Sequence, residues 1–223
     1  MMIRVFLVLL FVVNAHVSWA EEVSFKTADN ATIYANFQQR GPDAVLLAHG
    51  AIFNKDSWGE FEKQLLADNF TVLAIDFRGY NKSTQGHKVQ ALYEDVLAGI
   101  RFLRKQPGIS KVSVLGASMG AKAAAKASVY SQPKEIDQLI LLSPPRVYQP
   151  EKLKGQLLFI ASKGEYLAKI VKSAYIKAPE PKALELIDGK AHAQHIFKTS
   201  QAKLLTSTII NFLKNSSVTS SGL

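Results

Sequence analysis

The chain has 223 residues, of which 48% are hydrophobic and 20% are charged, and it contains no cysteine. This composition is typical of one globular domain with an ordinary core, and it argues against disordered, collagen-like and coiled-coil proteins. Without cysteine the chain has no disulfides, no Cys-ligated metal sites and no thiolate nucleophile. Its chemistry must therefore come from oxygen and nitrogen side chains. The formal charge of +9 leaves an acidic partner open.

The first 20 residues have the layout of a secretory signal peptide. Arg4 gives a positive start, residues 5–13 form an apolar run of nine, and Ser18-Trp19-Ala20 places small residues at the −3 and −1 positions of a cut after Ala20. A transmembrane helix needs about 20 apolar residues, so this run is too short to be one. We expect residues 1–20 to be removed and the protein to be exported, periplasmic or secreted, without a stable membrane anchor. The mature chain would have 203 residues and a charge of +8.

The remaining chain alternates between strand and helix patterns. We expect eight strands, over residues 23–26, 31–37, 44–48, 70–75, 111–115, 138–142, 156–161 and 183–187, with a hairpin at 27–30. Apolar spacing predicts helices around residues 61–66, 92–103, 119–130, 166–176 and 201–213. Several strands are apolar throughout, as buried parallel strands are. Such units predict an α/β protein with a mostly parallel sheet and helices on both faces. No linker divides them, so we expect one domain over residues 21–214 and a flexible tail at 215–223.

The motif Gly116-Ala117-Ser118-Met119-Gly120 stands between a predicted strand and an alanine-rich predicted helix. A nucleophile elbow needs glycines two positions before and after the serine, because the turn is strained and its neighbours are crowded. Ser118 would then project its hydroxyl from the carboxyl edge of the sheet. The N-terminus of the following helix would favour a developing negative charge there. The pattern therefore predicts Ser118 as a nucleophile.

A serine nucleophile needs a base and an acid that orients this base. The base should follow the last strand, where His192 lies; His195 is the rival, and its alternative role is a polar residue on the first turn of the next helix. The acid should follow the preceding strand, and Glu165 is the only carboxylate on that loop. Its alternative role is a first-turn carboxylate stabilised by the helix dipole. Asp188 is at the correct edge but close to His192 in sequence.

The segment His49-Gly50-Ala51-Ile52 directly follows the first fully apolar strand. Backbone N–H groups from this turn and from Met119 would together bind an oxyanion. We expect Ala51 to be the donor in the turn, with Ile52 as the alternative. We expect His49 to hold the loop by hydrogen bonds rather than to transfer protons.

These segments together resemble the α/β-hydrolase superfamily, over nearly all of residues 23–213. The resemblance is carried by residues 46–50, 76–83, 116–120 and 188–192. Residues 76–83 are similar to the superfamily's Asp-x-Arg-Gly-x-Gly-x-Ser turn, with Asn81 in place of a glycine. The small serine-hydrolase, esterase and dienelactone-hydrolase-like branches look most similar, although a dienelactone hydrolase proper uses cysteine.

The resemblance implies an α/β-hydrolase fold with Ser118 as nucleophile, His192 as base and Glu165 as acid, where the superfamily more often has Asp. It also implies Ala51 and Met119 as oxyanion donors, and hydrolysis of a carboxylic ester through an acyl-enzyme, with no metal or organic cofactor. A peptidase, thioesterase or lipase of the same fold, or a non-catalytic binding relative, remains the alternative.

Only 13 residues, 143–155, separate the predicted strands at 138–142 and 156–161, and they include three prolines. This leaves no room for a cap domain, so we expect an open, shallow site suited to small or protruding esters, with Phe53, Trp58 and Tyr80 as candidate lining residues. Lysines are spread over the whole chain without a dense basic stretch, which argues against a nucleic-acid partner. We expect a monomer acting on a small-molecule ester or acyl substrate.

Overall fold

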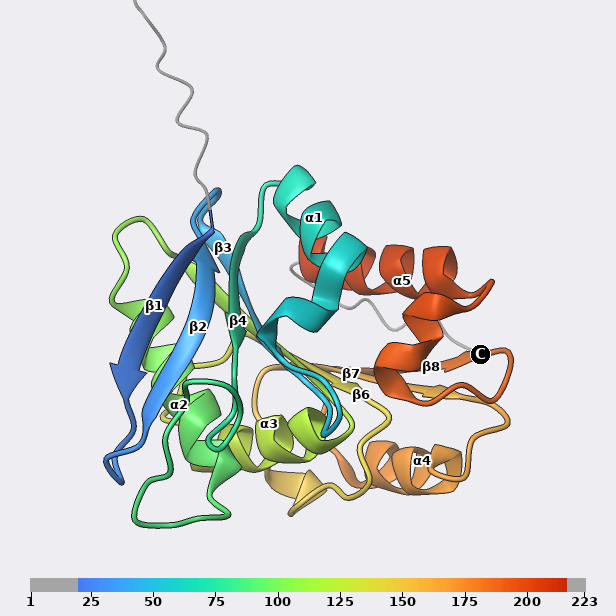
Figure 1. Cartoon of the computed structure of the whole chain (residues 1–223). Helices are drawn as coiled ribbons and strands as arrows, with labels where there is room; N and C mark the ends of the chain where they lie inside the picture. The colour runs from blue at the N-terminus through green and yellow to red at the C-terminus, as the bar shows by residue number, and fades with distance from the viewer. Residues whose placement is uncertain (1–19, 216–223) are drawn as a thin grey trace, which may run out of the picture.

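The computed structural model describes residues 20–215 (Figure 1). The predicted signal peptide, apart from Ala20, and residues 216–223 of the predicted tail lie outside the described residues. Eight strands form one sheet: β1 (Glu21–Lys26), β2 (Thr32–Gln38), β3 (Asp43–Ala48), β4 (Thr71–Ile75), β5 (Lys111–Ala117), β6 (Gln138–Leu142), β7 (Gln156–Ser162) and β8 (Lys182–Ile187). Their order is β1-β2-β4-β3-β5-β6-β7-β8. Only the pairs β1–β2 and β2–β4 are antiparallel, so the predicted mostly parallel sheet is confirmed.

Helices cover both faces of this sheet. Helices α1 (Gly59–Ala67) and α5 (Ala202–Lys214) lie on one face, and α2 (Leu92–Arg104), α3 (Met119–Tyr130) and α4 (Ala168–Lys177) lie on the other (Figure 1). All five begin and end within a few residues of the predicted ranges. Three short 3-10 helices were not predicted, because they lack the 3.6-residue period of an α-helix; they are η1 (Lys55–Trp58), η2 (Pro150–Lys152) and η3 (Ala193–Lys198).

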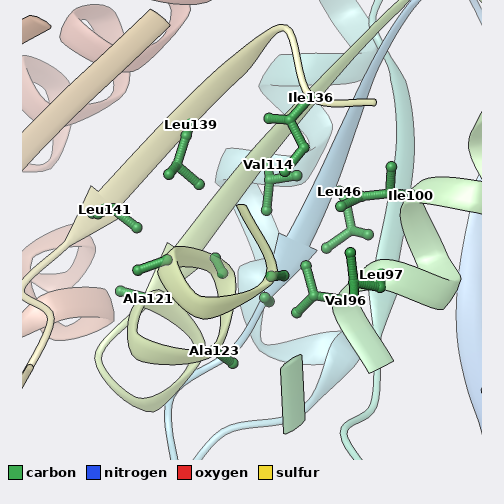
Figure 2. Close-up of a cluster of buried hydrophobic side chains, with 14 of the residues drawn as sticks. Leu46, Val96, Leu97, Ile100, Val114, Ala121, Ala123, Ile136, Leu139 and Leu141 are labelled. Atoms are coloured by element: carbon green, nitrogen blue, oxygen red, sulfur yellow. The ribbon is translucent and has the colours of Figure 1, made fainter. Parts of the chain in front are cut away.

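Alternate side chains of each buried strand enter the two cores. On β3, Leu46 packs in the core below α2 and α3, whereas Leu47 packs in the core below α1 and α5. Figure 2 shows Leu46 of β3 next to Ile100 of α2 at one side of this core, and Ala121 of α3 near Leu141 of β6 at the other. Burying one such leucine stabilises the fold by about 1.5–3 kcal/mol. The alanines of α3 let this helix lie close to the sheet.

Residues 143–155 form a loop that contains only the single turn η2, so no cap domain is inserted within the described part of the chain. Within residues 20–215, no helix has the length and apolar character needed to cross a membrane. Strands β3 to β8 run parallel, and the loops that follow them therefore meet at one edge of the sheet. This carboxyl edge holds Ser118, Glu165 and His192, which hydrogen bonds join there.

Candidate active site

Ser118 occupies the sharp turn between β5 and α3. Its backbone has φ of 51° and ψ of −111°, a conformation that costs a non-glycine residue about 1–3 kcal/mol. The two flanking glycines permit this turn because a Cβ atom on Gly116 would lie 2.5 Å from the Gly120 carbonyl oxygen. A Cβ atom on Gly120 would lie 2.1 Å from the Ala48 carbonyl oxygen. The spacing of the motif thus reflects contact between the backbones of β3, β5 and α3.

The predicted nucleophile, base and acid form a chain of hydrogen bonds. His192, between β8 and η3, places Nε2 2.8 Å from the Ser118 Oγ atom. Its Nδ1 atom lies 2.6 Å from Oε2 of Glu165, on the loop after β7. A carboxylate can only accept, so Nδ1 carries the proton and Nε2 is left to accept from the Ser118 hydroxyl. The arrangement is that of a hydrolytic triad in geometry.

The two rival residues lie elsewhere. His195 is exposed on η3, and its ring packs against the ring of Phe53 with centroids 5.2 Å apart. Asp188 is exposed as well, and its carboxylate lies 2.5 Å from Lys163 Nζ. The His195 N–H group donates to the His192 carbonyl oxygen at 3.0 Å, but neither the His195 side chain nor the Asp188 side chain forms a hydrogen bond with Ser118, His192 or Glu165.

Glu165 is fixed by two further donors. The Ser143 hydroxyl lies 2.5 Å and the Ser162 N–H group 2.8 Å from its Oε1 atom. The Ser143 Oγ atom also accepts from the Ala193 N–H group at 3.2 Å. The Glu165 side chain is only 3% exposed, and these donors together with His192 offset the cost of burying a carboxylate. Sequence reasoning missed Ser143; its place directly after β6, at the same edge as the site, was the available signal.

The turn after β3 lies beside the nucleophile, since a Cβ atom on Gly50 would be 3.6 Å from the Ser118 Cβ atom. The Gly50 N–H group donates to Gln194 Oε1 at 2.8 Å. The Tyr80 hydroxyl donates to the Ala51 carbonyl oxygen at 2.6 Å. These two bonds hold the segment in which Ala51 was predicted as oxyanion donor.

Met119 was predicted as the second oxyanion donor, and it is the first residue of α3. The N–H groups of the first helical turn have no acceptor within the helix, so that of Met119 is available to an anion. Ile52, the alternative donor in the turn after β3, has a side chain that is 78% exposed.

His49 is completely buried and holds the same turn. Its Nδ1 atom lies 2.8 Å from the Gly50 carbonyl oxygen, and its Nε2 atom accepts from the Phe77 N–H group at 3.2 Å. Burial lowers the pKa of His49, which favours the neutral imidazole. The predicted role of His49 in holding the loop agrees with these bonds.

The segment 76–83 packs against the turn that follows β3 and holds it by hydrogen bonds. Asp76 accepts from the Lys55 N–H group at 2.8 Å and from the Asn81 side-chain amide at 2.9 Å. Asn81 has φ of 45°, a conformation that asparagine tolerates, and this explains how it replaces the glycine of related turns. Arg78 is buried and ion-paired with Asp29 and Asp95. The Arg78 guanidinium holds the pKa of the Asp29 carboxyl well below its usual range.

The three candidate lining residues have different surroundings. Tyr80 is half-buried, and its hydroxyl lies between Ala51 and Met119 Sδ, at 3.8 Å from the sulfur. Phe53 and Trp58 both line a cavity of about 680 Å³ between η1, α1, η3 and α5. Trp58 is only 3% exposed, which is less than we expected for a residue that lines an open, shallow site. Among the described residues, no group of three or more His, Asp or Glu side chains is arranged to hold a metal ion.

The fold and the geometry at Ser118 define an α/β hydrolase. The sequence profile of the family described as "Serine aminopeptidase, S33" matches residues 40–206, and the chain therefore belongs to this α/β-hydrolase family. A Haemophilus influenzae protein described as "Putative esterase/lipase" is 28% identical over 134 residues, which are 59% of this chain and 43% of that protein. The chain spans less than half the length of the curated relatives it matches.

Two esterases are similar in structure. That of Pyrococcus furiosus has a TM-score of 0.74 at 21% identity, covering 88% of this chain and 92% of its own. That of Exiguobacterium antarcticum has a TM-score of 0.74 at 15% identity, covering 87% of this chain and all of its own. At these identities the likeness concerns the fold. It agrees with the family match, since both assign the α/β-hydrolase fold.

Proposed function

We propose that the protein is an exported serine hydrolase that cleaves small carboxylic esters through an acyl-enzyme on Ser118. The observation that carries the proposal is the continuous chain of hydrogen bonds from Ser118 Oγ through the His192 ring to Glu165. An imidazole nitrogen placed 2.8 Å from a serine hydroxyl is the arrangement that general-base activation requires.

The proposed reaction begins when Ser118 Oγ attacks the ester carbonyl carbon while its proton passes to His192 Nε2. The carbonyl oxygen becomes an oxyanion that accepts from the Ala51 and Met119 N–H groups. Glu165 stabilises the imidazolium, which then gives its proton to the departing alcohol oxygen. Water repeats the sequence on the acyl-enzyme, releases a carboxylic acid and restores Ser118. The reaction draws on no cofactor.

Two features support small esters as substrates and export as the destination. The loop at residues 143–155 leaves the carboxyl edge without a cap in the described part of the chain, so a protruding ester group can reach Ser118 directly. Residues 1–20 have the pattern of a signal peptide, which supports a periplasmic or secreted protein. We propose that it acts as a monomer on a small-molecule substrate, without a nucleic-acid partner.

A peptidase is the second candidate, because the matching family is described as a serine aminopeptidase family. Both activities use the same nucleophile, so they differ only in the leaving group. A panel of p-nitrophenyl esters of rising acyl length, assayed beside aminoacyl p-nitroanilides, separates them. We expect hydrolysis of acetate and butyrate esters, whereas faster release from the aminoacyl anilides would favour the peptidase.

Replacing the two carboxylates separately tests the proposed acid. Glu165→Gln keeps the size of the side chain but removes the charge facing His192. We expect kcat to fall by a factor on the order of 10³–10⁴. Asp188→Asn is the matched control, because Asp188 is exposed and paired with Lys163. A loss of activity in Asp188→Asn with full activity in Glu165→Gln would overturn the assignment.

A further inference from the structure

The turn after β3 carries the predicted oxyanion donors, and its other peptide groups are already bonded. The Gly50 carbonyl oxygen lies 2.8 Å from His49 Nδ1, and the Ala51 carbonyl oxygen accepts from the Tyr80 hydroxyl at 2.6 Å. Within the described part of the chain, no residue accepts from the Ala51 or the Ile52 N–H group. The turn therefore keeps these two donors free for an anion.

The Gly50 N–H group of this turn is bonded to the side chain of Gln194, which is 3% exposed. It donates to Gln194 Oε1 at 2.8 Å, across 144 positions of the chain. A Cβ atom on Gly50 would lie 3.4 Å from this amide oxygen and 3.6 Å from the Ser118 Cβ atom. Gln194 and the nucleophile thus pack against the same glycine. The bond to Gln194 fixes the turn at the point where it passes Ser118.

Gln194 also lies two residues after the base, His192, in the same segment. Ala193, between them, has φ of 50°, a left-handed conformation that is unfavourable for a residue with a Cβ atom. Such backbone strain is often found at functional sites. In this bent segment the His192 ring faces Ser118 while the Gln194 amide faces Gly50. Three consecutive residues therefore hold both the base and the support of the oxyanion turn.

Stability does not explain a glutamine at this buried position. The Gln194 Nε2 atom is shielded from solvent and has no hydrogen-bond partner among the described residues. A buried donor without a partner destabilises a protein. An apolar side chain of similar length would remove this donor but would leave the Gly50 N–H group unpaired, so one unpaired donor would replace another. The advantage of Gln194 therefore lies in the bond to Gly50 itself.

We propose that Gln194 is a positioning residue, which holds the turn after β3 so that the Ala51 N–H group faces the oxyanion; this inference rests on the proposed function. When Ser118 Oγ bonds to the ester carbonyl carbon, an electron pair of the C=O bond moves to the oxygen and the Ser118 proton passes to His192 Nε2. The new oxyanion is stabilised by donors that are already in place. Because Gln194 touches neither the substrate nor the reacting atoms, its loss should lower kcat and leave KM nearly unchanged.

Gln194→Met is the direct test, because it keeps the length of the side chain but removes the acceptor of the Gly50 N–H group. We expect kcat for p-nitrophenyl acetate to fall about tenfold or more, and KM to change less than about twofold, whereas loss of a donor itself costs about 10²–10³-fold. The melting temperature should change by less than about 3 °C, since one unpaired donor replaces another. Gln194→Asn keeps an amide but shortens the side chain by one methylene group, so it should show the same loss of kcat.

Gln138→Met is the matched control. Gln138 is a buried glutamine at the start of β6, at the edge of the sheet opposite to Ser118. Its Nε2 atom donates to the Phe212 carbonyl oxygen at 2.8 Å, and its Oε1 atom accepts from the Ser113 hydroxyl at 2.9 Å. Because these bonds are lost without relief of an unpaired donor, the melting temperature should fall by about 5 °C or more while kcat stays the same.

Inhibition by a trifluoromethyl ketone reports on the oxyanion itself. Ser118 Oγ adds to its carbonyl carbon, and the carbonyl oxygen becomes an anion that the same donors bind. In Gln194→Met the inhibition constant should rise by the factor by which kcat falls. The pH dependence of kcat should keep its shape, because His192 retains its bond to Glu165.

The proposal is overturned if both Gln194 variants keep the kcat of the wild type, if the inhibition constant does not rise, or if the pH profile shifts. A Gln194→Met protein that does not fold, or that loses as much stability as Gln138→Met, would show a structural role and overturn it as well. If the wild type hydrolyses no ester and Ser118 takes up no fluorophosphonate, the proposed function is refuted, and this inference with it.

Discussion

The Ser143 hydroxyl is the support of Glu165 that the sequence did not reveal, and Ser143→Ala tests its contribution. Ser143 is completely buried, and its Oγ atom donates to Glu165 at 2.5 Å while accepting from the Ala193 N–H group at 3.2 Å. The substitution leaves Ser162 and His192 as the remaining donors to the carboxylate. Glu165 then has freedom to turn away from the imidazole.

The size of the effect follows from the bonds that are lost. A hydrogen bond to a charged group contributes about 1.5–3 kcal/mol, and an N–H group left unpaired costs about 1–3 kcal/mol. If about 1.4 kcal/mol of this support is needed in the transition state, kcat falls about tenfold. We expect that loss with KM nearly unchanged, because Ser143 lies behind the acid and away from the substrate. Steady-state hydrolysis of p-nitrophenyl acetate measures both constants.

Ser113→Ala is the control. Ser113 is also a buried serine, and its hydroxyl donates to Gln138 Oε1 at 2.9 Å, near the start of β5. This variant should lose stability in thermal melts but keep its kcat. If Ser143→Ala retained the kcat of the wild type, or if both variants lost activity equally, Ser143 would have no specific role at Glu165.

Two further predictions concern stability. Gly120→Ala places a Cβ atom 2.1 Å from the Ala48 carbonyl oxygen and should lower the free energy of unfolding, measured in urea, by about 3 kcal/mol or more. Gly59→Ala is the control, because Gly59 also has a positive φ of 50° but open space around it, and it should cost about 1–2 kcal/mol. Equal losses in the two variants would show that the contact with Ala48 does not cause the effect. Asp29→Asn should destabilise the protein at pH 7 because Arg78 loses a buried partner. Since the folded pKa of Asp29 is depressed, the wild type begins to lose this advantage as the pH falls below the unfolded value of about 4, and the difference between the two unfolding free energies should shrink further as the pH approaches the folded pKa. If the difference between the two unfolding free energies stayed constant down to pH 2, the Asp29 carboxylate would contribute no pH-dependent stability.

The parts of the site that the sequence predicted are those with local patterns. The elbow around Ser118 is readable because the serine and its two glycines fall within five consecutive residues between a strand pattern and a helix pattern, although the crowding at Gly120 comes from the Ala48 carbonyl of β3. His192 and Glu165 are readable because the order of parallel strands places their loops at one edge. Apolar runs likewise predicted the eight strands, and apolar residues at 3.6-residue spacing predicted the five α-helices.

The remaining parts depend on contacts between distant segments. Gly50 and Gln194 are 144 residues apart, and nothing near either of them indicates their bond. The bond between Ser143 and Glu165 requires β6 and β7 to lie side by side, with their carboxyl ends aligned. The cavity beside Trp58 forms only when α5, at the end of the chain, packs next to α1. Such features follow from tertiary packing and have no periodic signal.

Labelling with a fluorophosphonate tests most directly whether Ser118 is an activated nucleophile. The native protein and Ser118→Ala are treated at neutral pH, and intact mass and peptide mapping count and place the adducts. We predict one adduct on the native protein, located on the peptide that contains Ser118, and none on the variant. Labelling that persisted in Ser118→Ala, or a folded native protein that took up no label, would contradict the proposed serine mechanism.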